Sequence, residues 1–312
     1  MEILYSLAGI RNPVMTPALL AITQLGSEIA AIAVSFILYW CFDKRKAYFL
    51  ITNVMFGTAI NQTVKFFCRV PRPFARDPEF EIVEAARADA GGYSFPSGHT
   101  TTAVAIFGSL AVVWKNKMTR FLCILVIALI GFSRVYLGVH YLSDVLGGLA
   151  CGLIVLAALY ALFRAADQNT RMLPLTFGIG AAVTLILALV LEFTSWDAGM
   201  DAENWAESVK NLNVCFGCLL ALAISEPLER KKIRFETGAI WWVQILKIVL
   251  GFACVMALRA ALKPAMAALF GNLGIATAIR YFLVAIFALD IWPLTFRWFS
   301  KLGMAKTQNA AN

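Results

Sequence analysis

The chain contains only two histidines, His99 and His140, and each lies in a short polar cluster that could handle phosphate. Asp144 follows His140 by four residues, which on a helix places both side chains on one face. A carboxylate at this spacing can hold an imidazole in one tautomer and leave the other ring nitrogen free to attack. We therefore predict that His140 is a nucleophile and that Asp144 orients it.

Three basic residues accompany the histidines, namely Lys65, Arg72 and Arg134. Their charges could balance a phosphate dianion and the charge that spreads over its oxygens during transfer, and a guanidinium can bind phosphate bidentately. Basic residues at helix ends also meet lipid headgroups, and that interpretation suits Arg69 and Arg76. Because the histidine clusters accompany them, we expect Lys65, Arg72 and Arg134 to bind phosphate.

The segment Pro96-Ser97-Gly98-His99 comes directly before an apolar run. Ser97 is expected to be the N-cap of a helix whose free N–H groups point at an anion, with Gly98 allowing close approach. An imidazole ordinarily titrates near neutral pH, so His99 is the predicted general acid for the leaving oxygen. No cluster of carboxylates or cysteines with metal-ligand spacing accompanies these residues, and we expect neither a metal nor another cofactor.

Composition indicates the elements that must position these groups. With 60% hydrophobic and 15% charged residues, the chain is too apolar for a soluble domain, and we predict an all-α polytopic membrane bundle. The net charge of +8 is typical of basic cytoplasmic loops, so no nucleic-acid partner is expected. Nine apolar runs have the length of a membrane span: 20–42, 47–67, 98–114, 120–138, 142–163, 172–191, 210–225, 239–259 and 278–299.

Basic residues at alternate ends of these runs orient the chain, because cytoplasmic loops are enriched in Lys and Arg. This predicts an N-terminus outside and a C-terminus inside, and it places all the phosphate-handling side chains at outer helix ends. The basic ends are at residues 44–46, 115–120, 164–171, 230–234 and 297–306, and the acidic outer loop contains Glu192, Asp197, Asp201, Glu203 and Glu207. Arg259, Lys263 and Arg280 do not fit this orientation.

Residues 1–18, broken by Pro13 and Pro17, are predicted to form a short interfacial segment. Residues 78–88 have the pattern of a short amphipathic helix that could be a lid or a plain surface loop.

Three motifs together, Lys-x6-Arg-Pro at 65–73, Pro-Ser-Gly-His at 96–99 and Ser-Arg-x5-His-x3-Asp at 133–144, resemble the signature of the type 2 phosphatidic acid phosphatase superfamily. The resemblance implies that His140 is phosphorylated transiently, that Asp144 orients it and that His99 protonates the leaving group. It also implies that the phosphoryl group is held by Lys65, Arg72, Ser97, Gly98 and Arg134.

The resemblance also implies a catalytic membrane core at 1–192, followed by further helices of unknown role at 193–312. We expect an integral membrane phosphatase, in the plasma membrane with its site outside, acting on a lipid phosphate or diphosphate such as phosphatidate, an isoprenyl diphosphate or a sphingoid-base phosphate. A phosphotransferase and a sugar-phosphate phosphatase remain alternatives within the family. A transporter is the alternative from another class, and the sequence sets no oligomeric state.

Overall fold

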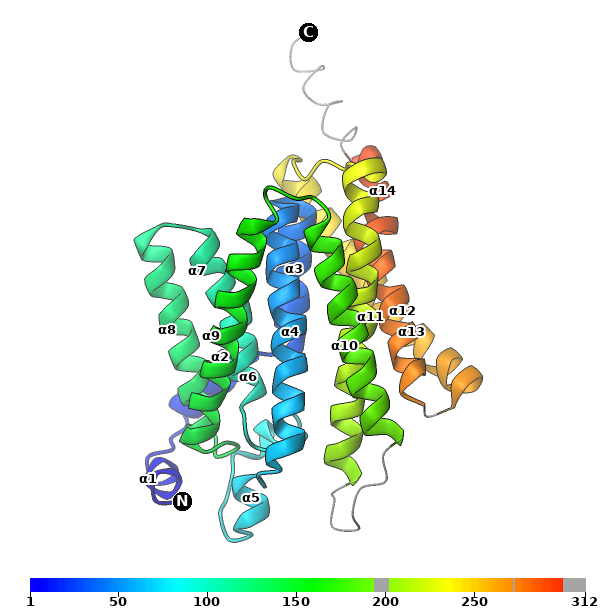
Figure 1. The fold of residues 1–312 in the computed structure, drawn as a ribbon. Coiled ribbons are helices and arrows are strands. Elements are labelled where there is room, and N and C mark those ends of the chain that lie inside the picture. The colour runs from blue at the N-terminus through cyan, green and yellow to red at the C-terminus, as the bar shows by residue number, and fades with distance from the viewer. Residues whose placement is uncertain (194–201, 272, 300–312) are drawn as a thin grey trace. The chain divides into compact units, whose positions relative to one another are not determined.

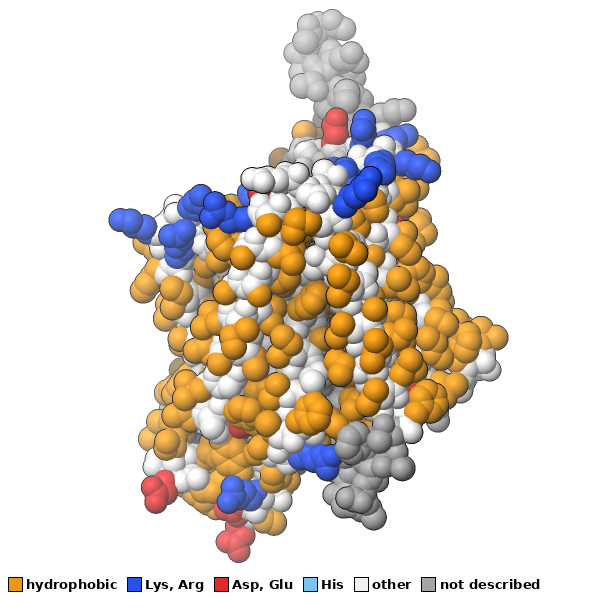
Figure 2. Space-filling view, in the orientation of Figure 1, with side chains coloured by type: hydrophobic (Ala, Val, Ile, Leu, Met, Phe, Trp, Pro, Cys, Tyr) orange, Lys and Arg blue, Asp and Glu red, His pale blue; other side chains and the backbone are white. Residues whose placement is uncertain are grey.

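The computed structural model describes residues 1–193, 202–271 and 273–299, and these ranges contain helices and no β-strand (Figure 1). The predicted all-α fold is confirmed. On the face that Figure 2 shows, hydrophobic side chains predominate along the middle of the helices. Four residues used for the topology prediction, Asp197, Asp201, Lys301 and Lys306, lie outside the described ranges.

Six helices among the described residues are long and apolar enough to cross a membrane. They are α8 (Lys117–Tyr136), α9 (Leu142–Ala165), α10 (Met172–Phe193), and the segments Ala202–Ile233, Trp241–Phe270 and Gly274–Phe299, which contain α11 (Ala202–Leu228), α12 (Trp241–Phe270) and α13 (Gly274–Ile286). The bent pair α2 (Met15–Gln24) and α3 (Glu28–Cys41) brings the number to seven if it forms one span.

Two of the nine predicted runs are helical but do not pass this test. Helix α4 (Lys44–Cys68) is long enough, and polar residues such as Asn53, Asn61 and Gln62 lower its hydropathy. The segment Gly98–Val113, which contains α6 (Gly98–Ala103), a π-helical turn and α7 (Ser109–Val113), is shorter. All nine runs are therefore helical, while length and composition support six or seven spans.

The predicted bounds of the first span, 20–42, are wrong. The helix begins at Met15 and breaks after Gln24 with a bend of 52°. Gly26 lies at the break, where a Cβ atom would be 2.9 Å from the carbonyl oxygen of His99, and the next helix starts with Ser27 Oγ accepting the N–H of Ala30. A close backbone contact therefore interrupts this apolar run. Helix α1 (Glu2–Gly9) precedes it, within the predicted interfacial segment.

The predicted amphipathic helix at 78–88 is also wrong, since only Glu84–Ala86 forms one 3₁₀ turn. The backbone of this connection forms a hydrogen bond with another part of the chain, in which the N–H of Val83 donates to the carbonyl of Leu137. Phe80 packs instead against Leu4 and Val135. Tertiary contacts therefore replace the local hydrogen bonds of a helix.

The chain forms two compact units. The first comprises Met1–Ile32, Leu50–Leu162 and Leu189–Leu212, and in it α1, α2 and α6 pack against α8. The second comprises Ala33–Phe49, Phe163–Ala188 and Asn213–Asn312, and in it α12 packs against α13. All eight predicted site residues belong to the first unit.

Close packing of α9 on the start of α6 generates a first prediction. A Cβ atom at Gly148 would lie 2.5 Å from the carbonyl oxygen of Ser97 and 3.1 Å from Cβ of Thr100. Gly148→Ala should lower the melting temperature in detergent, with a loss of about 2 kcal/mol, because the backbone must shift. Gly178→Ala in α10 is the control, since its Cβ would meet nothing within 4 Å and alanine favours a helix. Equal melting temperatures for the two variants would contradict the close approach.

Candidate active site

The predicted site residues lie at helix ends and in the connections between helices of the first unit. Lys65 and Arg134 are in the last turns of α4 and α8, Arg72 precedes the short helix α5 (Pro73–Arg76), and Asp144 is in the first turn of α9. The remaining residues are at the start of α6 and in the connection before α9: Ser97, Gly98, His99 and His140.

His140 and Asp144 form the predicted pair. Nδ1 of His140 lies 3.3 Å from Oδ2 of Asp144, and both residues are buried. On the other side of the ring, Nη1 of Arg72 lies 3.2 Å from Nε2. Because a guanidinium can only donate, Nε2 presents its lone pair and the proton of the neutral ring is on Nδ1, facing the carboxylate. Nε2 is therefore the ring nitrogen that carries no proton.

The pKa of His140 lies well below its ordinary value of 6.5. Burial is the main cause, followed by the positive charges of Arg72 and Arg134. A lowered pKa means that the ring stays neutral at pH 7 and that protonation begins only at a more acidic pH than for an ordinary histidine. The imidazole is therefore in the form that can attack phosphorus.

Arg72 is fixed by main-chain carbonyls from two connections. Its Nε donates to Gly92 at 2.9 Å and its Nη2 to Gly91 at 2.6 Å, while Nη1 also donates to Val139 at 2.9 Å. Burial lowers the pKa of this guanidinium to about 10, so it remains charged at neutral pH. The carbonyls position the charge without neutralising it.

Arg134 and Lys65 also have neutral partners. Arg134 is fully buried and donates to Thr23 Oγ1 and to the carbonyl of Asp89, both at 3.2 Å. Lys65 donates to the carbonyl of Tyr93. Among the residues that the structure describes, no carboxylate forms an ion pair with either residue or with Arg72. Three buried cations without a counter-ion create a strong preference for a bound anion.

The Pro-Ser-Gly-His segment starts α6 as predicted. Ser97 is the N-cap, its Oγ accepting the N–H of Thr100 at 3.4 Å, and its own N–H donates to the carbonyl of Asp144 at 2.9 Å. A Cβ atom at Gly98 would lie 3.8 Å from Oδ1 of Asn61, so the glycine keeps this space open. Nε2 of His99 is buried and has no hydrogen-bond partner among the described residues.

Ser94 is a site residue that the sequence patterns missed. Its Oγ donates to Oδ2 of Asp144 at 2.5 Å and lies 3.4 Å from Nδ1 of His140. The N–H of Tyr141 donates to the same carboxylate oxygen at 2.8 Å. Ser94 lies in an irregular connection, so its contact depends on the path of the chain and no spacing predicted it.

Asn61 was also missed, although the sequence carries a signal for it. Its Nδ2 donates to the carbonyl of Pro96 at 3.3 Å and to Thr101 Oγ1 at 3.0 Å, which holds the connection before α6. An amide four residues before Lys65 in an apolar helix shares a face with that lysine.

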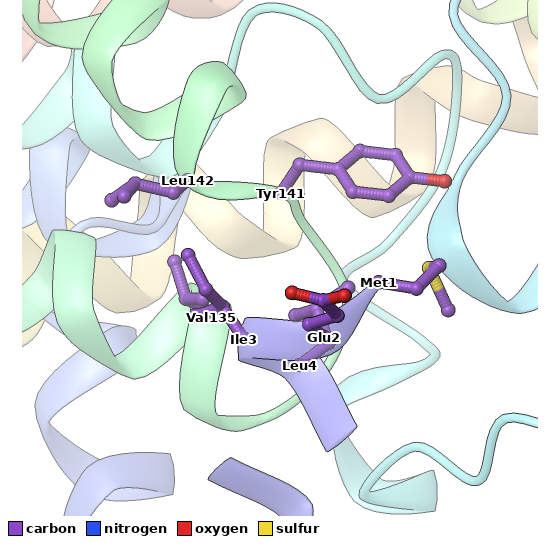
Figure 3. Close-up of a pocket in the computed structure, with 7 residues that line it drawn as sticks. All are labelled: Met1, Glu2, Ile3, Leu4, Val135, Tyr141 and Leu142. Atoms are coloured by element: carbon purple, nitrogen blue, oxygen red, sulfur yellow. The ribbon is translucent and has the colours of Figure 1, made fainter. Parts of the chain in front are cut away.

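A cavity of about 430 Å³ adjoins the residues that follow His140 (Figure 3). Its walls are the first four residues of the chain together with Val135, Tyr141 and Leu142. Aliphatic side chains make up much of this lining, so the cavity suits an apolar group.

Comparison with known proteins identifies the family. The family model described as PAP2 superfamily matches residues 46–168, which contain all eight predicted site residues. The undecaprenyl-diphosphatase BcrC of Bacillus subtilis is 34% identical over 161 residues, which are 49% of this chain and 79% of that protein. The chain belongs to the PAP2 superfamily. The predicted resemblance is confirmed, and the PAP2 chain is a phosphatase, which hydrolyses phosphate monoester or diphosphate bonds.

The second part of this PAP2 protein also matches a family model. The model described as PAP2 superfamily phosphatase, transmembrane extension, covers residues 214–307. With its apolar helices, this match identifies an integral membrane protein.

Two further relatives differ in how much of the chain they cover. Lipid A 4'-phosphatase of Porphyromonas gingivalis is 30% identical over 48% of this chain and 66% of its own length. Sphingosine-1-phosphate phosphatase 1 of Mus musculus is 26% identical over 77% of this chain and 58% of its own length. No solved structure matches the chain.

The hydrogen bond of Ser94 generates a second prediction. Ser94→Ala should lower kcat about tenfold with little change in KM, because a hydrogen bond to a buried carboxylate is lost and the substrate is not touched. Ser143→Ala is the matched control, since Ser143 Oγ contacts the other oxygen of Asp144 at a longer 3.5 Å. Steady-state phosphate release measures both variants, and an equal loss in the two would argue against a specific role of Ser94.

Proposed function

We propose that this chain hydrolyses a lipid phosphate or diphosphate through a phosphohistidine on His140, without a metal. One observation carries the proposal: three buried cations with neutral partners surround a neutral imidazole whose proton faces Asp144. The three cations carry more positive charge than the carboxylate of Asp144 can neutralise, so the site favours a phosphate dianion.

In the first step, Nε2 of His140 attacks phosphorus as the bond to the leaving oxygen breaks. Lys65, Arg72 and Arg134 hold the phosphoryl oxygens, and Arg72 exchanges its contact with Nε2 for one with phosphate. His99 gives its proton to the leaving oxygen, and Asp144 stabilises the charge that the phosphorylated ring acquires.

In the second step, a water molecule attacks the phosphohistidine. His99, now the base, takes a proton from this water, and the bond between phosphorus and Nε2 breaks. Inorganic phosphate leaves, and His140 and His99 regain their starting protonation states. Ser97 and Gly98 hold the phosphoryl group at the start of α6 in this proposal.

The substrate class is supported by the relatives and by the cavity. The names of the relatives include lipid A, undecaprenyl diphosphate and sphingosine 1-phosphate, which share a phosphate on a large apolar body. The cavity beside Tyr141 has the apolar lining that such a body requires.

The different roles of the histidines generate a third prediction. His140→Ala should abolish hydrolysis of both a lipid phosphate and p-nitrophenyl phosphate, because both need the nucleophile. His99→Ala should hydrolyse the lipid phosphate about a thousandfold more slowly than the wild type. Its rate with the nitrophenyl ester should fall much less, because that leaving group does not need a proton. Rapid-quench labelling should detect phosphoenzyme in the His99 variant and none in the His140 variant.

The same measurements can contradict the mechanism. Equal loss with both esters in His99→Ala would remove its role as general acid. Phosphate release by His140→Ala at the wild-type rate would remove the phosphohistidine.

For the topology, we propose nine membrane spans, an outer N-terminus, an inner C-terminus and a site on the outer face of the plasma membrane. The charges of α8 support this: Lys117 and Arg120 are at its start, whereas Arg134 at its other end belongs to the site. We also propose that residues 1–192 form the catalytic core and that 193–312 add further helices.

A natural cysteine provides a fourth prediction, which concerns this orientation. Cys68 is exposed at the end of α4 that carries Lys65, so a membrane-impermeant maleimide should label it in intact cells. Cys68→Ser gives the background value. In that background, Lys117→Cys at the start of α8 should react only after permeabilisation. The reverse labelling pattern would place the site on the cytoplasmic side.

A further inference from the structure

Glu207 lies at the edge of the phosphate site, although it is outside the three motifs. It is in the first part of α11, within the same compact unit as the site. A Cβ atom at Gly92, whose carbonyl binds Arg72, would lie 3.7 Å from Nζ of Lys65 and 3.8 Å from Cγ of Glu207. Glu207 and Lys65 therefore both adjoin Gly92.

Contacts within the unit hold this end of α11 in place. Ser208 Oγ donates to Oε1 of Gln62 at 3.3 Å, and the indole of Trp205 donates to the carbonyl of Leu191 at 2.9 Å. Gln62 is three residues before Lys65 on α4, so the hydrogen bond of Ser208 fixes α11 next to the helix turn that carries the lysine. The position of Glu207 is thus tied to the site.

The carboxylate of Glu207 already binds an ammonium group. It accepts from Nζ of Lys210 at 3.0 Å and from Nδ2 of Asn211 at 3.0 Å, both on its own helix. The side chains of Lys210 and Glu207 are 50% and 34% exposed, and an ion pair this exposed is weak. Another ammonium group can therefore replace Lys210 as the partner of this carboxylate.

We propose that Glu207 binds a substrate ammonium group, so that the enzyme prefers lipid phosphates with a free amine a few bonds from the phosphate. With the phosphate on Lys65 and Arg72, such an amine could reach Glu207, because Nζ of Lys65 and Cγ of Glu207 lie 3.7 Å and 3.8 Å from the same Cβ position at Gly92. The same carboxylate would disfavour substrates with additional negative charge, such as diphosphates. This inference rests on the proposed function, because it names the substrate of the same site.

Asp89 offers a matched control at another cation. Its carbonyl accepts from Arg134, its carboxylate accepts from Gln24 at 2.7 Å, and the residue is exposed. Asp89→Asn removes the same charge as Glu207→Gln but from the side of Arg134. The Asp89→Asn variant therefore distinguishes a general change in the electrostatic potential of the site from specific recognition of an amine.

The experiment compares sphingosine 1-phosphate with N-acetylsphingosine 1-phosphate, which has the same phosphate ester but an uncharged nitrogen. The full-length wild-type enzyme in detergent micelles should show about tenfold higher kcat/KM for the free amine, as expected for one charge-assisted hydrogen bond. Glu207→Gln should lower kcat/KM about tenfold for the free amine and less than about twofold for the acetylated lipid. Asp89→Asn should change both substrates by the same factor.

Three results would overturn the inference: equal kcat/KM of the wild type for the two lipids, an equal effect of Glu207→Gln on both, or the same selectivity loss in Asp89→Asn. The wild-type ratio does not depend on the folding of any variant. Failure of the proposed function is recognised separately, because His140→Ala would then release phosphate from both lipids as fast as the wild type.

Discussion

The unneutralised positive charge of Lys65, Arg72 and Arg134 is the constraint on which the site depends. A buried cation costs free energy unless hydrogen bonds or an opposite charge compensate it. Here the compensation inside the chain comes from carbonyl and hydroxyl oxygens, which satisfy donors but leave the charge in place. The fold therefore carries an electrostatic cost that only an anion can remove, and this connects stability to phosphate binding.

The irregular connection between α5 and α6 provides most of these oxygens. Its main-chain carbonyls at Asp89, Gly91, Gly92 and Tyr93 bind the three cations, and Ser94 binds Asp144. A regular helix would use the same carbonyls internally. The absence of regular secondary structure at 87–97 is thus what allows one short segment to hold groups from α4, α8 and α9.

Groups whose relation is fixed within one helix turn could be predicted from the sequence. His140 and Asp144 are four residues apart, and Ser97 caps the helix that follows it, so local geometry decides both. Ser94 could not be found this way, because its contact with Asp144 joins positions 50 residues apart.

The helices show the same division between local and tertiary causes. Hydropathy predicted a helix at every apolar run, since a backbone in an apolar environment must satisfy its hydrogen bonds internally. It did not predict the break at Gly26, where the cause is the backbone of His99 from another helix. Hydropathy also did not distinguish α4 from the more apolar helices. The polar residue Asn61 of α4 faces the site and not lipid.

The contact between Arg72 and Nε2 of His140 has a consequence for the chemical reactivity of the ring. While the guanidinium donates to Nε2, the lone pair is occupied, and electrophiles other than a bound phosphoryl group meet a capped nitrogen. In the proposed mechanism, a phosphate oxyanion takes over the hydrogen bond of Nη1 and thereby uncaps the nitrogen. The proposed mechanism therefore implies that the imidazole resists alkylation and metal coordination until a phosphate group is bound.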